Sequence, residues 1–137
     1  MNLRVLLAGL AAAFAAFFVG WVIYDMLLMD FFEANTISYD GLIKEQMCFA
    51  LIFAANLVYA ILLAWIYNNF KGSKSVVKAI GISAVIGIAF ALGLDLMFLA
   101  SYNLMNVPGT IVDVLASGVM YGVMGLVIGL IIKDKKE

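Results

Sequence analysis

Four long apolar runs occupy most of this 137-residue chain. They cover residues 5–24, 47–67, 79–100 and 107–132. An α-helix rises 1.5 Å per residue, so about 20 residues are enough to cross the roughly 30 Å hydrocarbon core of a bilayer. The sequence therefore predicts a single all-α integral membrane domain, residues 1–137, folded as an antiparallel bundle of four transmembrane helices.

The composition supports the same class. Hydrophobic residues make up 66% of the chain and charged residues 12%, whereas ordinary soluble domains carry about 25% charged residues. A soluble chain of this size would bury only about 68% of its surface, which is too little to hide so much apolar area. We therefore expect the lipid bilayer to be the main partner. Eight Lys and Arg residues are too few to predict a nucleic-acid interface.

Basic residues are distributed unequally among the predicted loops. Seven of the eight lie before the first run, between the second and third runs, or after the fourth: Arg4, Lys71, Lys74, Lys78, Lys133, Lys135 and Lys136. Only Lys44 lies in the remaining loops. By the positive-inside rule, both termini and the middle loop are predicted to be cytoplasmic.

Local signals predict where the first two helices begin and end. Residues 25–34 contain no helix breaker, so the first helix is expected to continue beyond the membrane and end near Asn35. The pair Asp40-Gly41 is typical of a turn and an N-cap. It predicts a second helix that runs to about Phe70.

The other two helices carry start signals of their own. Gly72 is a plausible residue just after the second helix, and Ser73 or Ser75 is expected to begin the third. Pro108 lies near the start of the fourth helix, where a missing backbone N–H costs nothing.

Small residues recur at helical spacing in three of the predicted helices. The rows are Gly118, Gly122, Gly125 and Gly129 in the fourth helix, Gly9, Ala13, Ala16 and Gly20 in the first, and Gly81, Ala84, Gly87 and Ala91 in the third. Such rows lie on one helix face and let backbones approach closely in lipid. We expect them to form packing seams, either within one bundle or against a second copy in a homodimer or a membrane-protein partner.

Three aspartates lie near the outer ends of the predicted helices, where lipid makes a charge costly. Asp25 ends the first run, Asp95 lies about 9 Å inside the end of the third, and Asp113 has a similar depth in the fourth. A carboxylate at mid-bilayer costs about 2.5–3.5 kcal/mol, so such a residue is a candidate for function. If the third and fourth helices form a hairpin, Asp95 and Asp113 are level and close.

Each aspartate also has a purely structural interpretation. Thr110 and Asp113 match the spacing of a capping box, and Asp25 can mark the membrane interface beside Trp21 and Tyr24. Asp95 shares a face with small residues and should point into the bundle. It then needs a hydrogen-bond donor, a bound cation, or a proton of its own.

Polar side chains that could accompany these carboxylates occur at helical spacing. Asn56 and Tyr59 share a face of the second helix, and Ser117 and Tyr121 share one with Asp113 on the fourth. The chain has no histidine, which excludes histidine ligation of haem. We find no nucleophile–base pair, metal triad or cofactor motif, so the sequence predicts neither an enzyme nor a cofactor or metal centre.

Two stretches of the chain show a diffuse resemblance to other proteins. The residues Gly20-Trp21-Val22-Ile23-Tyr24-Asp25-Met26-Leu27-Leu28-Met29-Asp30-Phe31-Phe32 and Gly93-Leu94-Asp95-Leu96-Met97 resemble a family of small four-span bacterial membrane proteins. The resemblance implies a multi-pass protein of a bacterial inner membrane and brings no known activity.

Two hypotheses follow for the function. The first is a non-catalytic helix-packing scaffold or accessory subunit that binds itself or another membrane protein, with its aspartates used in caps and polar networks. The second is a small transporter or binding protein whose outer carboxylates hold a metal ion or an organic cation. The sequence favours the first. The surroundings of Asp95 distinguish them, because a carboxylate that faces a polar cavity favours binding.

Overall fold

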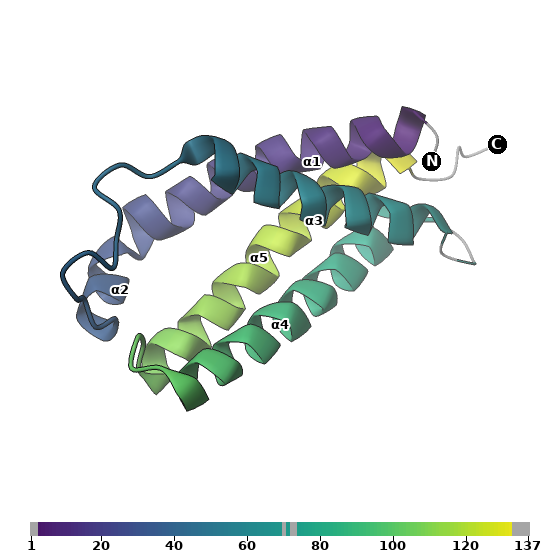
Figure 1. Ribbon diagram of the computed structural model, residues 1–137. Coiled ribbons are helices and arrows are strands. Elements are labelled where there is room, and N and C mark those ends of the chain that lie inside the picture. Colours follow the sequence, from purple (N-terminus) through teal and green to yellow (C-terminus); the bar gives the residue numbers. More distant parts are fainter. Residues whose placement is uncertain (1–2, 70, 72–73, 133–137) are drawn as a thin grey trace.

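The structure is a computed structural model that describes residues 3–69, 71 and 74–132. Its elements are α1 (Leu3–Trp21), the π-helix η1 (Val22–Leu27), α2 (Met29–Asn35), α3 (Phe49–Asn69), α4 (Val76–Ser101) and α5 (Val107–Ile132) (Figure 1). Four helical segments in these ranges are long and apolar enough to cross a membrane: Leu3–Leu27, Phe49–Asn69, Val76–Ser101 and Val107–Ile132. The predicted all-α class is confirmed, and so is the presence of four helices that are long and apolar enough to span a membrane. The predictions that concern Phe70, Gly72, Ser73, Lys133, Lys135 and Lys136 lie outside the described residues.

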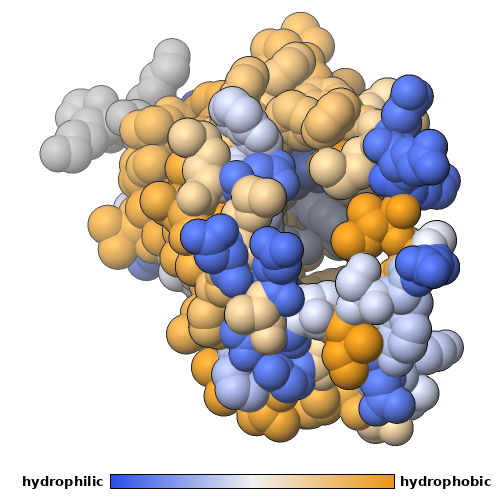
Figure 2. Space-filling model, turned by 90° about the vertical axis from the view of Figure 1, so that its left-hand side faces the viewer, coloured by the Kyte–Doolittle hydropathy of each residue, from blue (hydrophilic) through white to orange (hydrophobic). Residues whose placement is uncertain are grey.

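The long helices are arranged as two pairs that meet along α5. α4 lies beside α5, α1 lies beside α3, and α1 crosses α5 (Figure 1). The start of α1, the end of α3, the start of α4 and the end of α5 lie toward one end of the molecule (Figure 1). α2 and the link between α4 and α5 lie at the opposite end. Hydrophilic residues gather on that opposite end, around a hollow in the surface (Figure 2).

The first helix is not continuous, which corrects the prediction for residues 25–34. After Trp21 the backbone becomes the π-helix η1, and the Leu28 N–H bonds to the Ile23 carbonyl five residues back, at 2.8 Å. Leu28 leaves helical geometry, with φ −114° and ψ 7°, before α2 begins. Propensity alone could not reveal this interruption, because single-turn π-helices are fixed by tertiary contacts and gather at functional sites. The end of α2 at Asn35 agrees with the sequence prediction.

The second long helix begins later than predicted. Gly41 has φ +79°, a left-handed conformation that suits a glycine in a turn and cannot continue a helix. α3 therefore starts at Phe49, close to the beginning of the apolar run at residue 47, and residues 40–48 form an exposed link. The Asp40-Gly41 pair was correctly read as a turn and wrongly read as an N-cap.

Side-chain caps fix the starts of the other two long helices. The Ser75 hydroxyl accepts a hydrogen bond from the Lys78 N–H at 3.3 Å, which confirms Ser75 as the start of α4. Pro108 is the second residue of α5, as predicted. The cap of α5 is Asn106, whose Oδ1 accepts a bond from the Gly109 N–H at 2.9 Å.

The link before α5 is tied to the end of α2. The Ile37 N–H donates to the Leu104 carbonyl at 2.8 Å, and the Asn106 N–H donates to the Asn35 carbonyl at 3.1 Å. The amide of Asn106 also donates to Asn35 Oδ1 at 2.9 Å. These bonds fasten the two halves of the chain at the end that carries α2.

Three of the four glycines in the predicted row of α5 are buried against α4, and a methyl group on any of them would collide with it. It would lie 2.8 Å from Ile88 Cγ1 at Gly118, 2.8 Å from Ser83 Cβ at Gly125, and 2.8 Å from Ala79 Cβ at Gly129. At Gly122 the nearest atoms are at an ordinary 3.8 Å. Gly81, predicted to lie in a seam of the third helix, has nothing within 4 Å of an added methyl, so it does not pack within this chain.

The first helix uses its small residues in the same way. A methyl on Gly9 would lie 2.9 Å from the Cα of Ile61 on α3, and one on Gly20 would lie 2.9 Å from Met120 Cε on α5. Ala13 between them is fully buried. This row faces both neighbours of α1 and brings the end of that helix close to α5.

Candidate functional site

A cavity of about 290 Å³ lies where η1, α3, α4 and α5 meet. Its lining includes six of the seven polar residues that the sequence singled out: Asp95, Asp113, Asn56, Tyr59, Ser117 and Tyr121. The α4–α5 hairpin makes the two aspartates level, and α3 brings Asn56 and Tyr59 to the opposite wall. The seventh residue, Asp25, is exposed and lies elsewhere.

Asp113 is not part of a capping box, which corrects its structural interpretation. α5 begins at Val107, three residues before Thr110, and its cap is Asn106. The Asp113 Oδ1 atom instead accepts a hydrogen bond from the Tyr24 hydroxyl at 2.9 Å. The carboxyl group of Asp113 therefore connects η1 to α5 through a hydrogen bond inside the cavity.

Asp95 is the least satisfied polar group of the site. Its Oδ2 atom is buried and has no hydrogen-bond partner among the described residues. Its carboxyl group and that of Asp113 line the same cavity. Among the described residues that line this cavity, none carries a positive charge. A buried charge without a partner is costly, so the arrangement favours a proton shared by the pair or a bound cation.

Aromatic side chains form the wall that faces the carboxyl pair. The rings of Tyr59 and Tyr121 have centroids 5.8 Å apart, and Phe90 lies 6.1 Å from Tyr59. A methyl on Gly87 would overlap the Tyr121 ring, so the glycine makes room for that ring beside α4. Aromatic faces attract cations within about 6 Å of the ring centre.

Tyr24 is the residue of this site whose role sequence reasoning missed. Its place in the sequence suggests an interface aromatic, yet its hydroxyl donates to Asp113 in a cavity that Ser117 also lines. Its ring stacks on Phe32 of α2, with centroids 5.4 Å apart. The only sequence signal was its position next to Asp25. The π-helix that directs it inward leaves no recognisable pattern.

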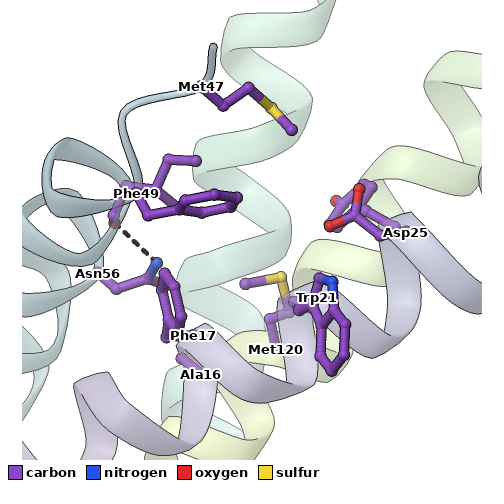
Figure 3. Close-up of a pocket in the computed structure, with 11 residues that line it drawn as sticks. Ala16, Phe17, Trp21, Asp25, Met47, Phe49, Asn56 and Met120 are labelled. Atoms are coloured by element: carbon purple, nitrogen blue, oxygen red, sulfur yellow. Dashed lines mark hydrogen bonds between the residues drawn. The ribbon is translucent and has the colours of Figure 1, made fainter.

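A second and larger cavity adjoins the first. It has a volume of about 600 Å³ and is lined mainly by apolar and aromatic residues, with Phe17 and Trp21 from α1 and Phe49 from α3 (Figure 3). Asp25 lies at its side opposite Phe49 (Figure 3). The two cavities share Tyr24, Asn56 and Met120 as lining residues. Asp25 thus lines the larger cavity and is not a member of the carboxyl pair.

Metal coordination has little support from the arrangement. Across residues 3–69, 71 and 74–132, no three His, Cys, Asp or Glu side chains come together in a way that could hold a metal ion. Comparison of the chain with protein-family models, curated proteins and solved structures finds no match. The resemblance to small four-span bacterial proteins stays a prediction, and conclusions about function depend on the geometry of the two cavities.

Proposed function

We propose that this chain is a non-catalytic membrane protein that binds, and in that way helps to transport, an organic cation between Asp95 and Asp113. The observation that carries the proposal is the buried Asp95 Oδ2 atom, which has no donor among the described residues and lies in a cavity beside a second carboxyl group. A cationic group placed beside them would offset the charge of both carboxylates.

An organic cation suits the site better than a metal ion. Hard metal ions need several oxygen ligands in close geometry, and the described residues contain no cluster of three carboxylate, thiol or imidazole ligands. The rings of Tyr59 and Tyr121 instead offer π-faces, which recognise ammonium groups. A volume of about 290 Å³ also exceeds what a bare ion requires.

The membrane arrangement that we propose is an antiparallel four-helix bundle in a bacterial inner membrane. Both termini and the link between α3 and α4 would be cytoplasmic, since they carry seven of the eight basic residues. The carboxyl cavity would then lie in the outer half of the bilayer, near the end that carries α2. A cation would enter from the outside.

The scaffold hypothesis gains support from a different surface. A groove of about 430 Å³ follows α4 and α5, with Ala84, Gly118 and Gly122 among its lining residues. Small residues at such a groove suit close contact with a helix of a second copy. Blue-native electrophoresis of the wild type and of Gly122→Leu tests this second role. The wild type should migrate as a dimer, and the variant should migrate as a monomer.

Thermal melting of the purified protein tests the cation site. Wild type, Asp95→Asn and Asp113→Asn are each melted with tetramethylammonium, longer alkylammonium ions and divalent metals. A ligand stabilises by RT ln(1 + [L]/Kd), about 2.7 kcal/mol at roughly 100 times Kd. The wild type should gain stability with organic cations, and both variants should lose most of that gain.

Asp25→Asn is the matched control for charge, because Asp25 is an exposed carboxylate outside the pair. It should keep most of the stabilisation by tetramethylammonium. If no cation shifts the wild type, or if Asp25→Asn abolishes the shift as fully as Asp95→Asn does, the carboxyl pair is not the binding site. The scaffold hypothesis would then take its place.

A further inference from the structure

The apolar cavity next to the carboxyl pair indicates what the rest of the ligand looks like. We infer that the ligand is an amphipathic cation, with its charged group between Asp95 and Asp113 and its apolar body in the cavity lined by Phe17, Trp21 and Phe49. This inference rests on the proposed function and adds the chemical class of the ligand.

The position of the two cavities side by side is the first support. Tyr24, Asn56 and Met120 line both of them, so a molecule that reaches past these side chains would have its head at the carboxyl pair and its body in the apolar space. The apolar cavity alone, at about 600 Å³, falls within the roughly 300–1,000 Å³ that small-molecule sites occupy. The carboxyl cavity, at about 290 Å³, suits a head group.

The walls of the larger cavity are built to hold an apolar body. Phe17 packs edge-on against Phe49 and Phe53, with ring centroids 6.5 and 6.0 Å apart. Trp21 and Ile52 complete the wall from α1 and α3. The amide of Asn56 donates one of its two N–H groups to the Ile52 carbonyl at 3.0 Å on its own helix.

Charge at the site selects among apolar molecules that could enter from the bilayer. Asp25 lines the apolar cavity, while Asp95 and Asp113 line its neighbour. A phospholipid brings a phosphate anion, which three nearby carboxylates would repel. A single-chain or aromatic ammonium compound without an anionic group fits the same space, and its positive charge is attracted by these carboxylates.

Two of the side chains that line both cavities differ in how firmly they are held. Tyr24 is fixed by its bond to Asp113 and by Phe32. Met120 packs on Gly20, where an added methyl would lie 2.9 Å from Cε. Because the thioether of Met120 is flexible, we expect it to move aside for a slender linker behind a compact cationic head.

Tryptophan fluorescence tests where the apolar body lies. The chain has two tryptophans of similar exposure, Trp21 at 53% and Trp65 at 51%; Trp21 lines the cavity, and Trp65 lies on α3 away from its lining. Trp65→Phe in lipid nanodiscs leaves Trp21 as the reporter, and Trp21→Phe leaves Trp65 as the matched control for partition into lipid. The probe is 12-bromododecyltrimethylammonium, whose bromine quenches indole only at contact, and 12-bromododecanol is the neutral control.

We expect saturable quenching of Trp21 by the ammonium probe, with no saturable component at Trp65. The alcohol should quench both equally and without saturation. Excess tetramethylammonium should relieve the quenching of Trp21. Adding Asp95→Asn and Asp113→Asn to the Trp65→Phe protein should abolish the saturable component.

The outcomes separate this inference from the proposed function. If tetramethylammonium stabilises the wild type and not Asp95→Asn, while Trp21 is quenched no differently from Trp65, the amphipathic ligand is excluded and the cation site stands. If the alcohol quenches Trp21 saturably as well, the cavity is a lipid-chain site and the inference fails. If cations of every length leave melting unchanged, both proposals fall.

Discussion

The hydroxyl of Tyr24 donates a hydrogen bond to Asp113 Oδ1 at 2.9 Å, across 89 residues of sequence. It joins the π-helix after α1 to the second turn of α5 and closes one side of the carboxyl cavity. Phe32 stacks on the same ring, so α2 also depends on this position. A single side chain thus links the irregular part of the first helix to the candidate site.

Tyr24→Phe removes that donor and keeps the ring. Because Asp113 Oδ1 loses its partner inside the protein, the free energy of unfolding should fall by about 1–3 kcal/mol. Tyr39→Phe is the matched control, since its exposed hydroxyl donates to the Asn103 carbonyl at 3.2 Å and water can replace that bond. Unfolding by SDS titration in mixed micelles measures both. Equal losses would mean that the Tyr24 bond is solvated and does not order the cavity.

Asn106→Ala should destabilise the end of the molecule that carries α2. The side chain caps α5 through the Gly109 N–H and donates to Asn35, so its loss removes a cap and a link between loops. Loss of a cap alone costs about 1 kcal/mol, and we expect a larger total here. Asn106→Asp keeps the cap and loses the donated bond, so its cost should be intermediate. Hydrogen exchange at Gly109 and Thr110 measures the loss of the cap directly.

Glycine substitutions on α5 should differ sharply between neighbouring positions. A methyl on Gly125 meets Ser83 and the backbone of α4, and such overpacking typically costs about 1–3 kcal/mol. Gly122→Ala meets only ordinary contacts at 3.8 Å. Gly81→Ala on α4 meets nothing within 4 Å and should stabilise by up to about 1 kcal/mol through helix propensity.

We expect SDS titration to give the highest free energy of unfolding for Gly81→Ala, a lower one for Gly122→Ala and the lowest for Gly125→Ala. If Gly125→Ala and Gly122→Ala lose the same amount, the close approach of α4 and α5 does not control stability.

The sequence predicted best those features of the fold that depend on one local property, such as hydropathy or helix capping. Hydropathy and length located the four spans, and a serine at Ser75 marked a helix start because only the local backbone is involved. The hairpin of α4 and α5 made the proximity of Asp95 and Asp113 predictable from depth alone. Helical spacing predicted that Asn56 and Tyr59 share one face of their helix. Their position in the same cavity as the aspartates depends on how α3 packs, which spacing along the sequence does not give.

The features that sequence reasoning missed depend on contacts between distant segments. The π-helix η1 turns Tyr24 toward Asp113, and nothing in residues 22–27 signals that change. Thr110 and Asp113 had the spacing of a capping box, yet Asn106 had already capped the helix one turn earlier. Asp25 ends the first apolar run on the same side as the other aspartates, yet it is exposed and lines the neighbouring cavity.

The single cysteine offers a test of the proposed membrane orientation. Cys48 is exposed, directly before α3, in the link that the distribution of basic residues places outside the cell. In spheroplasts it should react with a membrane-impermeant maleimide. The matched control is Cys48→Ser combined with Lys71→Cys, which moves the thiol to an exposed residue at the other end of α3. That protein should stay unlabelled until the membrane is permeabilised. Labelling of the Lys71→Cys protein in sealed spheroplasts, with protection of Cys48, would invert the topology and place the carboxyl cavity in the cytoplasmic half of the bilayer.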